Sequence, residues 1–392
     1  MLSKRVESLK PSPTIALSAK LRELKEKGVD VIGFGAGEPD IDTPPFIKEA
    51  CIKALKEGKT KYPPAGGIPE LREALSHKLK EENSLHYSPS EIVVTVGAKL
   101  AIFLVLQAVL NEGDEVLLPA PYWVTYEEQI RLSGGVPVII HTKMEEGFTL
   151  RHEDVKERIT RRTKLIIINS PNNPTGAVYD QNELRKIADL CRKEGIMILS
   201  DECYENLIFD ETTHTSIASF GEDVREITFT VNSFSKTFSM TGWRVGYVAC
   251  PEPLAKVLAS LNSQYVSNTP TFAQYGALTA LTHPESKAFI EEMRETYRRR
   301  REIISEGLSL LPGVKTFKPG ATFFIFPDFS HYTTAFGGDV KFSEKLLEKA
   351  LVGTVPGSAF GAEGFLRMSF ALKEETIEKG IERIALFLKE LR

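Results

Sequence analysis

One lysine lies in an unusually hydroxyl-rich stretch of the sequence. The segment NSFSKTFSMTGWRVGY, residues 232 to 247, surrounds Lys236 with three serines and two threonines, and Arg244 follows eight positions later. One interpretation is a Ser/Thr-rich surface turn with a solvated lysine. The other is an anion-binding site around a reactive amine, and the rest of the chain must decide between the two.

Polar side chains also follow several short apolar runs that are typical of buried strands. Ligands of open α/β sheets bind beyond the carboxyl ends of the strands, so we expect these side chains to lie together. Gly97, Ala98 and Lys99 follow the run EIVVTV at a helix start, where free N–H groups and the helix dipole favour a phosphate. The others follow KLIIIN, IMILS and EITFTV or lie in PAPYW: Asn173, Asp201, Tyr204, Ser233, Ser235 and Trp123.

Capping of an element explains each of these residues when it is taken alone. Together they form a more specific set: a nucleophilic lysine, a carboxylate, a phosphate site, an aromatic plate and a tyrosine. A pyridine-ring aldehyde cofactor with a phosphate tail requires these groups. Lys236 would bind the aldehyde carbon, and Asp201 would keep the ring nitrogen protonated so that the ring accepts electrons.

The elements that must position these residues alternate between strands and helices. The runs EIVVTV, DEVLLP, VPVIIHT, KLIIIN, IMILSD, EITFTV and WRVGYVAC predict a mostly parallel sheet that is buried on both faces. Beyond about residue 285 the sequence predicts a long charged helix, isolated strands in ATFFIFPDF and LRMSFAL, and a closing helix. We therefore expect an α/β large domain over residues 45–285 and a smaller α+β domain from 1–44 and 286–392.

Composition argues against several other classes of protein. A chain of 392 residues suggests two domains, and 42% hydrophobic with 26% charged residues is ordinary for a globular protein. A net charge of −4 gives no global field to attract nucleic acid or an acidic membrane. The sequence shows no signal-peptide core and no apolar run of about 20 residues, so we expect a cytoplasmic protein.

Metal and dinucleotide sites have little support in the sequence. The four cysteines and seven histidines are scattered without CxxC or HExxH spacing, so no metal is expected. The segment GFGAGEPD has glycines spaced like a dinucleotide-binding loop, but such a loop must open directly into a helix. Here Pro39, Pro44 and Pro45 follow instead, which favours an irregular turn close to a ligand.

The order of the motifs resembles the class I aminotransferases, which are pyridoxal 5'-phosphate (PLP) enzymes of the fold type I transferases. Within them the sequence is similar to the aspartate aminotransferases of the branch common in prokaryotes. The matching motifs span nearly the whole chain: GAGEPD, KYPPAGGIPELREAL, PAPYW, NSPNNPTG, SDECY, SFSKTFSMTGWRVGY, VPGSAFG and LRMSF.

The resemblance implies a role for each cofactor-binding residue. Lys236 carries PLP and later moves a proton, and Asp201 pairs with the pyridine nitrogen. Tyr204 and Asn173 bond the phenolic oxygen, while Trp123 stacks on the ring. Tyr62 reaches the phosphate from a second subunit, and Ser235 and Lys99 also lie at the cofactor. Within the subunit, the phosphate is held by Gly97, Ala98, Ser233 and Arg244.

The resemblance also implies the substrate contacts. Arg367 in FLRMSF would bind the α-carboxylate, Lys99 the distal carboxylate of an acidic substrate, and Gly37 would let the N-terminal segment close over it. Trp123 and Asn173 complete this set.

We accordingly expect a homodimer with shared active sites that carries out ping-pong transamination from aspartate to 2-oxoglutarate. Three alternatives stay open. The first is a related aminotransferase of prephenate, aromatic or alanine specificity, and the second is a PLP-dependent lyase or synthase of the same fold. The third, a transcription regulator with a degenerate aminotransferase domain, would need a DNA-binding module, for which residues 1 to 30 are too few.

Overall fold

A seven-stranded sheet forms the centre of the protein in this computed structural model, which describes residues 7, 9 and 13–391. Its strand order is β2-β8-β7-β6-β5-β3-β4, and only β8 runs antiparallel to its neighbours. Each of the seven apolar runs became one strand, so the expected mostly parallel α/β sheet is confirmed. The strands are β2 Ile92–Thr95, β3 Glu115–Ala120, β4 Val136–His141, β5 Thr163–Asn169, β6 Met197–Asp201, β7 Thr228–Ser233 and β8 Gly246–Ala249.

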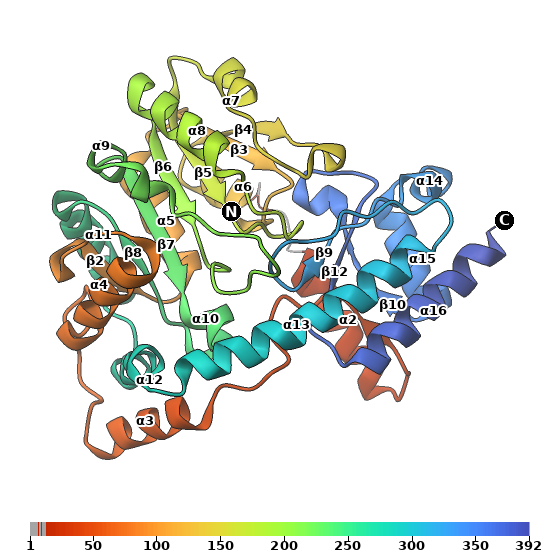
Figure 1. Cartoon of the computed structure of the whole chain (residues 1–392), viewed down its shortest axis with the longest axis horizontal. Helices are drawn as coiled ribbons and strands as arrows, with labels where there is room; N and C mark the ends of the chain where they lie inside the picture. The colour runs from red at the N-terminus through yellow and green to blue at the C-terminus, as the bar shows by residue number, and fades with distance from the viewer. Residues whose placement is uncertain (1–6, 8, 10–12, 392) are drawn as a thin grey trace.

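Helices cover both faces of this sheet (Figure 1). Alternate residues of one strand pack into different clusters, with Leu118 in the cluster of α5 and Leu117 in that of α8. The edge strand β4 is an exception to the predicted burial, because Val136 at its start is 43% exposed. The helices of residues 45–285 are α3 Pro45–Lys56, α4 Pro69–Asn83, α5 Ala98–Val109, α6 Thr125–Leu132, α7 His152–Arg158, α8 Gln181–Glu194, α9 Glu222–Arg225, α10 Phe234–Thr237, α11 Glu252–Val266 and α12 Thr271–Thr282.

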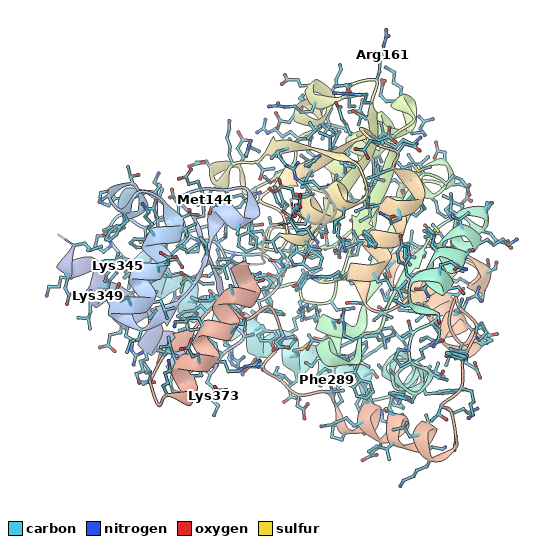
Figure 2. All side chains as sticks on the ribbon, turned by 180° about the vertical axis from the view of Figure 1, so that it is seen from behind. Met144, Arg161, Phe289, Lys345, Lys349 and Lys373 are labelled. Carbon is cyan, nitrogen blue, oxygen red and sulfur yellow. The ribbon has the colours of Figure 1, made fainter. Side chains whose placement is uncertain are left out.

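The long helix α13, Ser286–Ser309, runs from α12 toward the C-terminal elements (Figure 1). Near its start Phe289, labelled in Figure 2, packs against both the cluster of α5 and the cluster of α4 and α12. Beyond α13 lie two small sheets, β1–β10 and β11-β12-β9. The remaining elements are α2 Pro13–Glu26, β1 Ile32–Gly33, β9 Phe324–Ile325, α14 Ser330–Thr333, α15 Asp339–Ala350, β10 Val352–Gly353, β11 Val355–Pro356, β12 Leu366–Ser369 and α16 Glu374–Glu390.

The second part of the chain thus mixes helices with short strands. The strand expected in ATFFIFPDF is only the two-residue β9, while the long helix, the strand in LRMSF and the closing helix form as expected. The exact domain boundaries stay a prediction, and residues 1–6, 8, 10–12 and 392 of the smaller predicted domain lie outside the described residues. Over the described part of the chain, none of the helices combines the length and apolar character needed to cross a membrane.

The sheet topology explains why distant segments meet. Strands β2, β3, β5, β6 and β7 point in the same direction, so their carboxyl ends share one edge of the sheet. Strand β12 and the segment after β1 supply further residues to the same edge, and the resulting cavity is the candidate site.

Candidate active site

A cavity of about 420 Å³ opens at the carboxyl edge of the sheet. Its size is that of a pocket for a small organic molecule. Segments after all five strands line it, together with α2, the loop after β1 and β12. The lining residues are Thr14, Ser18, Gly35, Gly37, Glu38, Ala98, Lys99, Trp123, Val124, Thr125, Tyr126, Asn169, Asn173, Asp201, Cys203, Tyr204, Ser233, Ser235, Lys236, Thr241, Arg244 and Arg367.

Lys236 enters the cavity from the short helix α10, directly after β7. Its ammonium nitrogen donates a hydrogen bond to the carbonyl of Gly37 and lies 5.9 Å from the ring centre of Tyr204. Burial lowers the pKa of the Lys236 amine to about 8, and the positive charges of Arg367 and Arg244 act in the same direction. A much larger fraction of this amine than of an ordinary lysine is therefore neutral and nucleophilic near neutral pH, although the charged form still predominates at pH 7.

Asp201 ends the neighbouring strand β6 and is buried. Tyr126 donates a 2.7 Å hydrogen bond to one carboxylate oxygen, and the backbone N–H of Cys203 donates to the other at 3.1 Å. Burial raises the pKa of Asp201, while the Tyr126 hydrogen bond opposes that rise. A carboxylate held in this way is suited to pair with a cationic ring nitrogen in the cavity.

An anion cradle lies where α5 begins. Gly97 precedes the helix with a φ of 76°, and the first N–H groups of a helix have no partner within it. Arg244 is fixed beside it by a 2.8 Å hydrogen bond to the Thr241 carbonyl. A side chain at Gly97 would bring its Cβ to 2.4 Å from the Arg244 guanidinium, so only glycine permits this approach.

Arg367 of β12 is the most enclosed cation of the cavity. It donates to the Asn173 side-chain oxygen at 3.2 Å and to the Gly35 carbonyl at 3.0 Å, while its Nε has no partner among the described residues. Its guanidinium also lies near the rings of Phe324 and Phe360. Burial lowers the pKa of Arg367 to about 10. A buried guanidinium with an unpartnered donor is suited to a planar anion such as a carboxylate.

Lys99 lies in the first turn of α5, with its nitrogen 4.9 Å from the ring centre of Trp123. Burial lowers the pKa of Lys99, and the charge of Arg244 lowers it further. Trp123 in turn meets Tyr126 edge to face at 5.4 Å. Trp123 thus contacts both Lys99 and Tyr126, and Tyr126 is the residue that donates a hydrogen bond to Asp201.

The structure brings together twelve of the fourteen residues singled out from the sequence. Gly97 is not itself in the lining but precedes Ala98, which is. Tyr62 is 89% exposed and lies outside the cavity of this chain. Its loop is nevertheless anchored, because Thr271 donates to the Lys61 carbonyl at 2.7 Å.

Sequence reasoning missed several residues of the cavity. Tyr126 lies three positions after Trp123, and its position in the first turn of a helix after PAPYW was the only signal. Asn169 ends β5, accepts from the Asn173 N–H at 3.0 Å and donates to the Asp201 carbonyl at 3.1 Å. Cys203, between Asp201 and Tyr204, was considered only among the scattered cysteines that predict no metal site. The others missed are Thr14, Ser18, Gly35, Glu38, Val124, Thr125 and Thr241.

Comparison with known proteins places this geometry in a family. Residues 29–384 match the family model described as aminotransferase class I and II. The chain belongs to the class I and II aminotransferases. It is 63% identical to an Aquifex aeolicus protein named "Probable aspartate/prephenate aminotransferase", over 100% of this chain and 99% of that one. It is 45% identical to the aspartate aminotransferase of a Bacillus species, with 99% of each chain covered.

The solved structures agree with this assignment. An aspartate aminotransferase from Thermus thermophilus with maleate superposes with a TM-score of 0.94 at 46% identity, covering 98% of this chain and 99% of that one. The family resemblance read from the motifs is therefore confirmed, and the protein is an aminotransferase.

The amine of Lys236 is expected to titrate well below an ordinary lysine. In the cofactor-free protein, acylation of Lys236 followed across pH by peptide mass spectrometry should reach half its maximum near pH 8, because burial disfavours the ammonium form. Between about pH 8 and 10.5 the unfolded lysine binds a proton that the folded one does not, so this group's contribution to the free energy of unfolding rises with pH there.

Lys186 supplies an internal control in the same digest. It is exposed, and its hydrogen bond to Glu183 raises its pKa, so its reactivity should still be rising after that of Lys236 has levelled off. A Lys236 midpoint at the ordinary value of 10.5 would contradict the lowered pKa of this amine.

Proposed function

We propose that this enzyme transfers the amino group of aspartate to 2-oxoglutarate, with PLP as its cofactor. The observation that carries the proposal is the Lys236 amine, with its lowered pKa, in one cavity with Asp201 and Arg367. When bound, PLP supplies an electron-accepting ring that stabilises negative charge at the substrate α-carbon.

The residues of the cavity fit this cofactor. Lys236 would hold the aldehyde carbon and Asp201 the ring nitrogen, while the α5 start and Arg244 would hold the phosphate. Trp123 is available as a stacking plate, and Tyr204 and Asn173 as partners of the phenolic oxygen. The close approach of Arg244 to Gly97 supports the phosphate assignment, because it leaves a guanidinium beside free helix N–H groups.

The same cavity suits a dicarboxylic substrate. Four cationic side chains line it against two carboxylates, those of Glu38 and Asp201, so it favours ligands with more than one negative group. Arg367 would bind the α-carboxylate, to which its free Nε and planar fork are suited. Lys99 would meet the distal carboxylate that aspartate and 2-oxoglutarate share.

Lys236 has a second task in this proposal. With substrate bound, its amine would take the proton from the substrate α-carbon and hold it for return later in the reaction. A base with a pKa of about 8 is close to the working pH, and such a match favours proton transfer in both directions. Gly37, whose carbonyl accepts from Lys236, would help the N-terminal segment to close over the substrate.

Prephenate is a second candidate substrate. The relative at 63% identity and one from Thermus thermophilus at 47% are both named as aspartate/prephenate aminotransferases. A lysine is a point charge on a flexible stem, and it discriminates less sharply than an arginine fork. Lys99 above the flat Trp123 ring could therefore accept a larger carboxylate.

We further propose a cytoplasmic homodimer whose active sites are shared. Tyr62 supports this, because its side chain is 89% exposed while its loop is held to the body of the protein. Asn262 of α11 donates to the Ala65 carbonyl at 2.8 Å, which fixes the other end of that loop. A tyrosine fixed outward in this way can enter the cavity of a second copy.

Lys236 should be the residue that binds the cofactor covalently. Borohydride reduction of the yellow holoenzyme should attach the cofactor to Lys236 in a peptide map, and Lys236→Ala should bind PLP but lose essentially all turnover. Asp201→Asn serves as a matched variant that keeps the lysine and removes the ring-nitrogen partner. It should keep the covalent label while turnover falls, and a label on any other lysine would overturn the assignment.

Lys99 should determine the preference for acidic substrates. Lys99→Met keeps an aliphatic stem over Trp123 and removes the charge, so kcat/KM for aspartate should fall by at least about tenfold, or roughly 1.4 kcal/mol. The activity toward alanine should be spared. The ratio of the two kcat/KM values in wild type and variant is the measurement, and an unchanged ratio would show that Lys99 does not bind the distal carboxylate.

Tyr62 should act in the partner's active site. The Tyr62→Ala homodimer should bind PLP at least about tenfold more weakly, as expected for loss of a hydrogen bond to a charged phosphate. Mixed dimers of Tyr62→Ala and Lys236→Ala subunits should regain activity, because one of the two sites then has both native residues. Absence of any recovery in the isolated mixed dimer would show that Tyr62 acts within its own subunit or not at all.

A further inference from the structure

A buried polar network adjoins the residues that line the cavity and begins directly after Tyr204 in the chain. Its centre is Glu205, whose side chain is 7% exposed and pairs with the buried ammonium of Lys78 from α4. Asn83 donates to one Glu205 oxygen at 2.5 Å, and Asn232 donates to the other at 2.6 Å. These groups do not line the cavity, and the chemistry described above makes no use of them.

The central pair of this network is ionised. Burial by itself would raise the pKa of Glu205, but the charges of Lys78 and His214 and the hydrogen bonds from Lys78 and Asn83 together outweigh it, and the pKa lies below its usual range. Burial by itself would lower the pKa of Lys78, but the charge and hydrogen bond of Glu205, with further negative groups such as Glu82, together raise it. An ion pair held under a sheet edge is costly to desolvate, so its retention suggests a use beyond stability.

Asn232 connects this pair to the segment that carries the reactive amine. While its Nδ2 donates to Glu205, its side-chain oxygen accepts the backbone N–H of Ser233 at 2.7 Å. Ser233 lines the cavity and directly precedes α10, on which Lys236 lies. On the other side Glu205 follows Tyr204, and its own N–H donates to the Glu202 carbonyl at 3.0 Å.

The Glu205 to Asn232 hydrogen bond is therefore a cross-brace between the segment after β6 and the last residues of β7. Asp201 ends β6 and Tyr204 lies in the segment that follows it, while Lys236 lies on α10, directly after β7. Backbone pairing between β6 and β7 ends at Asp201 and Val231, before Lys236 is reached. Beyond that point this side-chain bond links the segment after β6 to the end of β7.

We propose that Glu205 and Asn232 are positioning residues, which hold the Lys236 turn at the correct place relative to Asp201 and Tyr204. The inference rests on the proposed function, because it assigns to these residues the alignment of the same lysine. Alignment of this kind matters because displacement of a reacting group by about 1 Å can cost on the order of a hundredfold in rate.

Asn83 offers a matched control within the same network. Like Asn232 it is a buried asparagine that donates one Nδ2 hydrogen bond to Glu205, but its side-chain oxygen accepts from Lys78 instead of the Lys236 segment. It also donates to Ser216 at 2.9 Å. Asn83→Ala thus removes a comparable bond from Glu205 and leaves the link to Ser233 intact.

The test compares Asn232→Ala with Asn83→Ala. Both should lower the temperature of thermal unfolding, since each leaves buried polar groups without a partner. Only Asn232→Ala should lower kcat, by at least about fivefold with KM for aspartate little changed, because the lost alignment acts on the reacting amine. Asn232→Ser, which replaces the two-ended amide by a single shorter hydroxyl, is measured in parallel in case the alanine variant does not fold.

A second readout needs neither cofactor nor turnover. In the cofactor-free protein the acylation midpoint of Lys236, about 8 in the wild type, should rise toward the ordinary lysine value in the Asn232 variants and stay in place in Asn83→Ala. If PLP proved not to attach to Lys236, this midpoint would still report the position of the amine. Equal effects of the two asparagine variants on kcat and on the midpoint, or no effect of Asn232, would overturn the proposal.

Discussion

A lysine amine and a buried carboxylate must share one cavity without pairing with each other, and the rest of the structure depends on this constraint. Lys236 and Asp201 come from the ends of adjacent parallel strands, β7 and β6. The two side chains have different hydrogen-bond partners in the protein. Asp201 accepts from Tyr126 and the Cys203 N–H, whereas Lys236 donates to Gly37. The cofactor ring proposed between them has a position for each charge.

The two halves of the cavity have different origins. The sheet edge supplies Asp201, Lys236 and the α5 start, whereas Arg367 arrives from β12 and Gly37 from the loop after β1. Arg367 ties these halves together, because it donates both to Asn173 on the sheet side and to the Gly35 carbonyl. A substrate carboxylate at Arg367 would therefore act on the junction at which the N-terminal segment meets the sheet.

Much of this arrangement could be predicted from the sequence, and for identifiable reasons. Continuous apolar runs located all seven strands, and the rule that ligands bind at carboxyl strand ends collected Asp201, Ser233 and Lys236. The rest depends on tertiary contacts. Arg367 came from the family resemblance alone, since no spacing places a residue of β12 beside Asn173. The Tyr126 bond to Asp201 crosses 75 positions, and Glu205 was missed because nothing in its local sequence shows that Lys78 would cover it.

The excess of cations explains how one cavity can serve both cofactor and substrate. Lys99, Lys236, Arg244 and Arg367 face Asp201 and Glu38, and the pKa of Lys236 is lowered by burial and by both arginines. Anions at Arg244 and Arg367 would relieve part of that repulsion, so binding of a phosphate and a carboxylate should each favour the protonated lysine. The arginines that would attract the anionic ligands thus also lower the pKa of Lys236, the residue that would act on the substrate. The protonation of Lys236 is in this way coupled to the binding of anions in the cavity. Lys236 is only one of the four cationic side chains that line this cavity, and the other three would hold the anions.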